Sequence, residues 1–150
     1  MSKRQTGFTL LGLLFLVAVL GLGLAALGSV WSTLNQREKE AELLFIGDQY
    51  RRALISYYRL GPGLDKHYPK KLADLLRDPR FPNTVRHLRR LRPDPISGGD
   101  WALLRDEEGG IKGVHSISTA LPRKTAGFPR ENAAFEGASQ YADWQFVADK

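Results

Sequence analysis

Residues 7–31 read GFTLLGLLFLVAVLGLGLAALGSVW, and this stretch decides how the chain is organised. Lys3 and Arg4 precede it, and no charged residue follows until Arg37. The uncharged run exceeds the roughly 20 residues that a helix needs to cross a bilayer. Basic residues on its N-terminal side predict that this end faces the cytoplasm. We therefore expect a single-pass inner-membrane helix over residues 8–31, with the rest of the chain periplasmic.

The junction between the basic leader and the apolar run carries a specific pattern. G-F-T-L-x-x-L-L, from Gly7 to Leu14, resembles the processing site of type IV pilins and type II secretion pseudopilins. The resemblance implies that residues 1–7 are a leader, and that a prepilin peptidase cleaves after Gly7 and methylates the amino group of Phe8.

One position departs from the family pattern. The family usually has glutamate at mature position five, where this chain has Gly12. In the family, that glutamate is thought to meet the methylated amine of the adjoining subunit and so to set axial register. Gly12 cannot do so, which favours a minor or tip subunit. The alternative is a major subunit that fixes its register by packing alone.

The N-terminal region is also compatible with two alternative classes of protein. An ordinary secretory signal peptide is one, because Ala26-Leu27-Gly28 forms a small-x-small cleavage site. Against it, the apolar region exceeds the roughly 7–15 residues of such signals, and the helical pattern continues past the cut. A plain signal-anchored protein is the second alternative.

Beyond the apolar run, the pattern becomes amphipathic without a proline or a turn signal. Apolar side chains recur at steps of three and four residues, which predicts one buried stripe along the helical segment 32–60. The charged side chains between Arg37 and Arg52 fall outside this stripe. Gly61-Pro62-Gly63 ends the helix, so we expect it to run from Phe8 to Leu60. The stripe consists of Leu43, Ile46, Tyr50, Ala53 and Tyr57.

Residues 61–150 predict a small head with mixed secondary structure. Segments 70–77 and 84–91 predict short helices. Runs bounded by turn signals such as Glu108-Gly109-Gly110 predict three antiparallel strands. The overall expectation is an α+β fold: a long N-terminal transmembrane and amphipathic helix packed on a small antiparallel sheet. The predicted strands are 101–104, 113–118 and 141–147.

The head also resembles the family. Y-P-x-x-L-x-x-L-L at Tyr68–Leu76, D-P-x-x-G at Asp94–Gly98 and Y-x-D-W-x-F-V at Tyr141–Val147 recur in heads that resemble major pseudopilins. Some of those heads hold calcium before the last strand. The acidic residues near that region do not have the spacing of a calcium loop, so we expect a solvated loop there. These residues are Glu131, Glu136 and Asp143.

No pattern of catalytic residues stands out, so we expect neither an enzyme nor a bound cofactor or metal. The chain has no cysteine, which excludes disulfides and thiolate metal sites. His67, His87 and His115 lie on separate predicted elements and lack metal-ligand spacing. The glycines form neither a dinucleotide-binding nor a phosphate-binding loop.

The remaining candidate for a functional surface is an arginine-rich segment. Its members are Arg77, Arg80, Arg86, Arg89, Arg90 and Arg92. A nucleic-acid surface would bind phosphates through such side chains. Few aromatic residues interleave them, so base stacking is not indicated and nucleic acid is not the expected partner. We expect Arg86, Arg89 and Arg90 to form a solvated helix face or a basic contact surface for acidic residues of a neighbouring subunit.

The family resemblance implies a function. It indicates a structural pseudopilin of a periplasmic fibre in type II protein secretion. The implied partners are prepilin peptidase, other pseudopilin subunits, the inner-membrane assembly platform and the membrane itself. The alternative is a minor type IV pilin or a DNA-uptake pseudopilin that uses a basic head surface.

Overall fold

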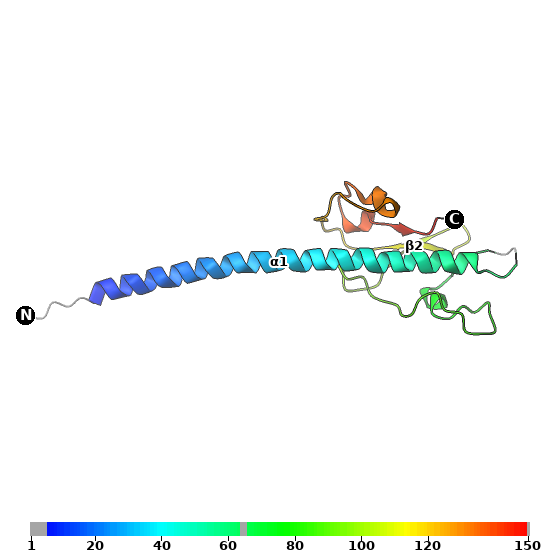
Figure 1. Ribbon diagram of the computed structural model, residues 1–150, viewed down its shortest axis with the longest axis horizontal. Helices are drawn as coiled ribbons and strands as arrows, with labels where there is room; N and C mark the ends of the chain where they lie inside the picture. Colours follow the sequence, from blue (N-terminus) through cyan, green and yellow to red (C-terminus); the bar gives the residue numbers. More distant parts are fainter. Residues whose placement is uncertain (1–5, 64–65, 150) are drawn as a thin grey trace, which may run out of the picture. The chain divides into compact units, whose positions relative to one another are not determined.

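The structure, a computed structural model, describes the backbone of residues 6–63 and 66–149, and their side chains apart from those of 6–9 and 22–33. The chain divides into two compact units, Met1–Arg37 and Glu38–Lys150. The described elements are a long helix, three short 3-10 helices and three strands. In chain order they are α1 (Thr6–Arg59), η1 (Leu72–Leu75), β1 (Ala102–Arg105), β2 (Ile111–His115), η2 (Arg130–Phe135), η3 (Tyr141–Asp143) and β3 (Phe146–Val147). Figure 1 labels the long helix and the central strand of the sheet.

Helix α1 agrees with the predicted continuous helix to within about two residues at either end. No proline interrupts it, and its last turn is closed by a hydrogen bond from the Leu60 amide to the Ser56 carbonyl. The chain then turns away at Gly63, whose φ of +67° lies in the left-handed region that favours glycine.

The described residues contain no helix that is both long enough and apolar enough to cross a membrane. This finding contradicts the transmembrane helix predicted over residues 8–31. It equally contradicts the predicted single-pass inner-membrane localisation with a cytoplasmic N-terminus and a periplasmic head.

The α+β character of the head is as predicted. Its sheet is antiparallel and has the order β1-β2-β3. Leu103 pairs with Val114, and Val114 pairs with Phe146 on its other side. A register shift between Leu104 and Arg105 ends the first pairing.

Strands β2 and β3 are shorter than the sequence predicts, β3 most of all, whereas β1 has the predicted length. Only Phe146 and Val147 pair in β3, because residues 141–143 form η3 instead. The Asp143 carboxylate accepts hydrogen bonds from the backbone amides of Ser139 and Gln140. These bonds favour a tight turn over an extended strand.

The predicted helix over residues 84–91 is wrong, because this segment is irregular. Its backbone bonds to the preceding segment rather than to itself. The amides of His87 and Leu88 both donate to the Leu75 carbonyl at 2.9 Å, and the Asp78 amide donates to the Val85 carbonyl at 2.9 Å. The segment is therefore held as a loop against η1.

The predicted stripe of α1 forms the centre of the core. Its five members are each no more than 2% exposed. The Trp101 ring packs on Tyr50 at 5.4 Å and on Phe146 at 6.3 Å between ring centroids. Figure 1 shows the sheet along one side of the second half of α1, and the green segment that follows the helix along the other side.

Candidate functional site

The predicted cleavage junction lies at the start of α1. Gly7 and Phe8 belong to its first turns, and their side chains lie outside the described residues, as do residues 1–5. Gly12 lies one turn further along. A Cβ atom added there would have nothing within 4 Å. Steric crowding within one chain therefore does not explain why the family glutamate is missing.

The helix after the junction presents apolar side chains on every side. Every large apolar side chain from Leu10 to Leu20 is at least 49% exposed, and Phe15 reaches 73%. Because these positions cover three helical turns, they leave no polar face. An exposed apolar surface of this extent marks a binding surface.

The structure separates the arginines that the sequence grouped together. Arg80 leaves the surface: its side chain is only 10% exposed and pairs with Asp78 at 2.6 Å. Its guanidinium also lies 3.6 Å from the centroid of the Tyr57 ring and donates to the Tyr57 carbonyl at 2.7 Å. Arg80 therefore fixes the loop to α1 and is not part of a contact surface.

Asp78 is the centre of a buried polar network. Its carboxylate accepts hydrogen bonds from the Arg80 guanidinium at 2.6–3.2 Å and lies 3.1 Å from His87 Nε2. His87 Nδ1 lies 2.9 Å from Ser56 Oγ on α1. The side chains of Asp78 and His87 are fully buried. Ser56 is half-buried, and this Ser-His-Asp chain acts as a structural link between α1 and the loop.

Burial alone would raise the pKa of the Asp78 carboxyl. Hydrogen bonds from the side chain and backbone of Arg80 and from His87 outweigh burial and lower that pKa to about 2. Because the pKa in the folded state is below its unfolded value of 3.8, ionised Asp78 stabilises the fold. This contribution is complete above about pH 4 and disappears as the pH falls toward 2.

We expect the wild-type chain to lose about 2 kcal/mol of unfolding free energy between pH 5 and pH 2 through Asp78. Urea unfolding at several pH values measures the loss. An Asp78→Asn variant should be less stable at pH 5 and should lack this part of the acid response. Asp74→Asn, on the neighbouring 3-10 helix, is the matched control. An acid response in Asp78→Asn equal to that of wild type would contradict the assignment.

A groove of about 660 Å³ lies between α1 and residues 87–92. We call it the arginine groove, after the four arginines in its lining. Exposed Arg89 and Arg90 come from the loop, whereas exposed Arg86 is not among the lining residues. The four are Arg52, Arg89, Arg90 and Arg92.

Only two of the four groove arginines are paired within the described residues. Arg52 pairs with Asp48 at 2.9 Å, and Arg92 lies 3.7 Å from Glu42. No described carboxylate lies within ion-pairing distance of Arg89 or Arg90. The groove thus has an excess of positive charge. It contains Arg89 and Arg90, two of the three arginines predicted as a contact surface. It also contains Arg52 of α1, which was not predicted to belong to that surface.

Two charged residues of α1 that lie outside the predicted stripe are nevertheless buried. Glu40 is 3% exposed, and its Oε1 accepts from the Arg123 amide at 2.6 Å and the Tyr141 hydroxyl at 2.8 Å. Arg51 is 8% exposed and donates to Asn132 Oδ1 at 2.6 Å. Burial lowers the pKa of Arg51, and the nearby Asp48 carboxylate offsets part of that effect.

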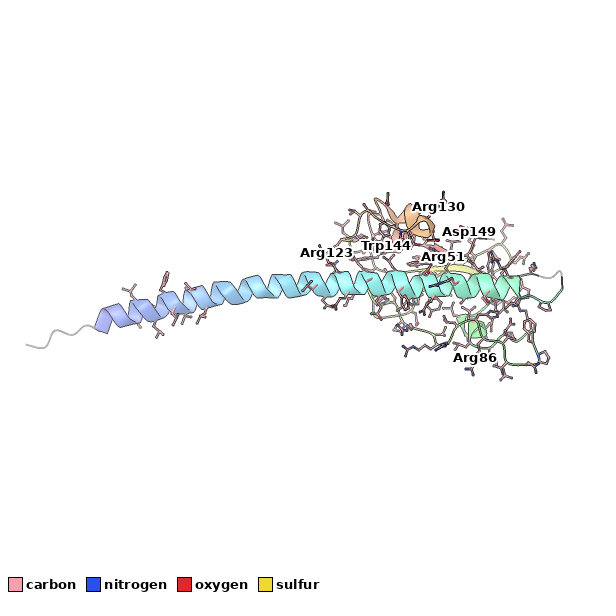
Figure 2. The ribbon with its side chains drawn as sticks, viewed as in Figure 1. Arg51, Arg86, Arg123, Arg130, Trp144 and Asp149 are labelled. Carbon is pink, nitrogen blue, oxygen red and sulfur yellow. The ribbon has the colours of Figure 1, made fainter. Side chains whose placement is uncertain are left out.

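These two residues were missed because their partners are distant in the sequence. The spacing held one clue, since Glu40 precedes Leu43 by three residues and so extends the buried stripe toward the N-terminus. Both side chains tie C-terminal loops to α1. Figure 2 labels Arg51 on the helix and Arg123 in the loop that Glu40 holds.

The other titratable residues are scattered. The Nδ1 atoms of His67 and His115 lie near backbone carbonyls at 3.1 and 2.9 Å. No group of three or more potential ligands for a metal ion occurs in the part of the chain that the structure describes. Glu131 and Glu136 are exposed, and Asp143 holds the turn before β3.

Comparison with known proteins found no relative of this chain. No family model matches the sequence, and neither a curated protein nor a solved structure matches it significantly.

Proposed function

We propose that this chain is a structural, pilin-like subunit (a pseudopilin) of a fibre that takes part in type II protein secretion. The observation that carries the proposal is the uncovered apolar surface of α1 from Leu10 to Leu20, which begins two residues after the processing junction. The junction pattern from Gly7 to Leu14 supplies the resemblance to pseudopilins. In this proposal, prepilin peptidase removes residues 1–7 and methylates Phe8.

The exposed apolar side chains from Leu10 to Leu20 would be removed from water if the same segments of several copies packed together. Removing apolar surface from water is favourable by about 25 cal/mol per Å². Small residues let helices approach closely. Added Cβ atoms at Gly12 and Gly21 would meet nothing within 4 Å, so these positions leave open space beside the helix. Copies of the chain would therefore assemble through this segment, while the folded head remains on the fibre surface.

The head is suited to a structural role. Its core joins α1 to the sheet through aromatic rings in tilted and edge-on contact. The Ser56–His87–Asp78 chain joins α1 to the loop on the other side. Loops that hold charged side chains at fixed positions can then determine how neighbouring heads meet.

Cross-linking between copies tests assembly through the apolar segment. The chain has no cysteine, so a Leu14→Cys protein has one reactive thiol. Mild oxidation in the native cell should give disulfide-linked dimers of the Leu14→Cys protein. The same substitution in a chain that cannot be processed at Gly7 is the matched control and should give few dimers.

Secretion tests the role of the fibre. A cell without this chain should retain proteins that it normally exports, and the wild-type gene should restore their release. Dimers with normal protein release would exclude the role in secretion. Absence of both dimers and a secretion defect would overturn the whole proposal.

A further inference from the structure

Besides the arginine groove, the head carries a second unpaired charged feature, the turn between β1 and β2. We call it the acidic turn; it consists of Asp106, Glu107 and Glu108. Glu107 and Glu108 are exposed, and neither has an ion-pair partner among the described residues. The hairpin tip therefore carries negative charge without a close ion pair, although Lys66 and Lys112 line the same cavity.

The acidic turn is held in one conformation by its own hydrogen bonds. Asp106 Oδ1 accepts from the amides of Glu108 at 3.1 Å and Gly110 at 2.7 Å. Arg105 donates to the Gly109 carbonyl at 2.7 Å. Gly109 has a φ of +79°, which only glycine adopts without strain. A preordered turn loses little conformational freedom when it binds a partner.

The two features lie on opposite sides of α1 within the head. Figure 1 shows β2, which follows the acidic turn, on one side, and the loop segment that lines the groove on the other. Figure 2 places Arg86, from that loop, and Asp149 on these opposite sides. Asp149 lines a cavity of about 490 Å³ together with the acidic turn. A single chain therefore does not bring the acidic turn into its own groove.

We propose that the acidic turn of one copy docks in the arginine groove of the next copy. The contact rests on the proposed function, because it needs neighbouring copies, and it names the surfaces through which their heads meet. Glu107 and Glu108 would face Arg89 and Arg90, whose guanidinium groups can bind carboxylates through two parallel hydrogen bonds. The contact joins two different surfaces of the same chain, so it leaves a free groove and a free turn at the two ends. Repeated contacts of this kind build an open-ended polymer when the rotation between copies does not close a ring.

The contact serves orientation more than affinity. Exposed ion pairs contribute little individually and are screened by salt. Complementary charges nevertheless set the register between surfaces and disfavour wrong arrangements. Contacts between the heads would also set the axial register, a role that the family glutamate has and that Gly12 cannot perform.

Charge exchange in the full chain tests the pairing. Arg89→Glu/Arg90→Glu and Glu107→Arg/Glu108→Arg should each reduce assembly by about tenfold, because each places like charges opposite one another. The chain with all four substitutions should recover most of the assembly. Arg86→Glu is the matched control, since it removes an exposed arginine of the same loop outside the groove. Loss in both double variants without recovery in the fourfold variant would overturn the pairing.

Disulfide trapping gives a second readout. A chain with Arg90→Cys and Glu107→Cys should form a ladder of oligomers on mild oxidation, whereas each single variant should stay monomeric. If Leu14→Cys still forms dimers but this ladder is absent, the fibre stands and the head contact is wrong. Loss of both the Leu14→Cys dimers and the oligomer ladder would overturn the proposed function as well. If duplex DNA binds the wild-type chain and Arg89→Glu/Arg90→Glu abolishes that binding without any ladder, the groove is a nucleic-acid surface and the proposal fails.

Discussion

A Gly47→Val chain should be destabilised by about 3 kcal/mol, the largest loss that we expect from one substitution in the head. Gly47 lies in the second half of α1, and a Cβ atom added there would overlap the ring of Phe146. That ring is fully buried, with the Phe135 ring 5.1 Å and the Arg51 guanidinium 5.5 Å from it. Because the ring has no room to move, the helix and β3 would have to separate.

Urea unfolding followed by tryptophan fluorescence measures this effect, since Trp101 and Trp144 are both buried in the head. Gly21→Val is the matched control. It makes the same change in the same helix, at a position where an added Cβ meets nothing within 4 Å. Helix propensity alone would make either substitution neutral or slightly stabilising. Equal stability of the two variants would show that β3 does not pack on Gly47.

Replacing Gly7 with aspartate should reduce processing on the order of 10²-fold, because a misplaced scissile bond loses much of its reactivity. In the proposed function, the peptidase binds the backbone at the junction closely, and a side chain on Gly7 prevents that approach. The chain should keep residues 1–7 and fail to assemble. Gly12→Asp, five residues away, is the control and should be processed normally. A Gly7→Asp chain with the same N-terminus as wild type would contradict the assignment of the junction.

Local spacing predicted much of the head. The stripe from Leu43 to Tyr57 was found because helical periodicity needs only neighbouring residues. The hairpin was found because Glu108-Gly109-Gly110 is a strong turn signal. The helix over residues 84–91 was predicted wrongly, because a hydrophobic pattern cannot show that backbone amides bond elsewhere, here to Leu75.

The spacing of residues along the sequence could not predict the buried charges or the arginine groove. Glu40 and Arg51 look solvated until Arg123 and Asn132 are brought next to them by the fold. Arg80 looked like a surface cation and became the partner of buried Asp78. Arg52 belongs to α1, and only the folded loop places it beside Arg89. The transmembrane prediction relied on the length of the uncharged run, and the described residues contradict it.

The N-terminus of the chain, isolated from its native cell, tests the central claim most directly. Tandem mass spectrometry of its N-terminal peptide should find that the chain begins at Phe8 with a methyl group on the amino nitrogen. A chain that begins at Met1 or at Ser29 would contradict the proposed processing, and with it the account of this protein as a pilin-like subunit.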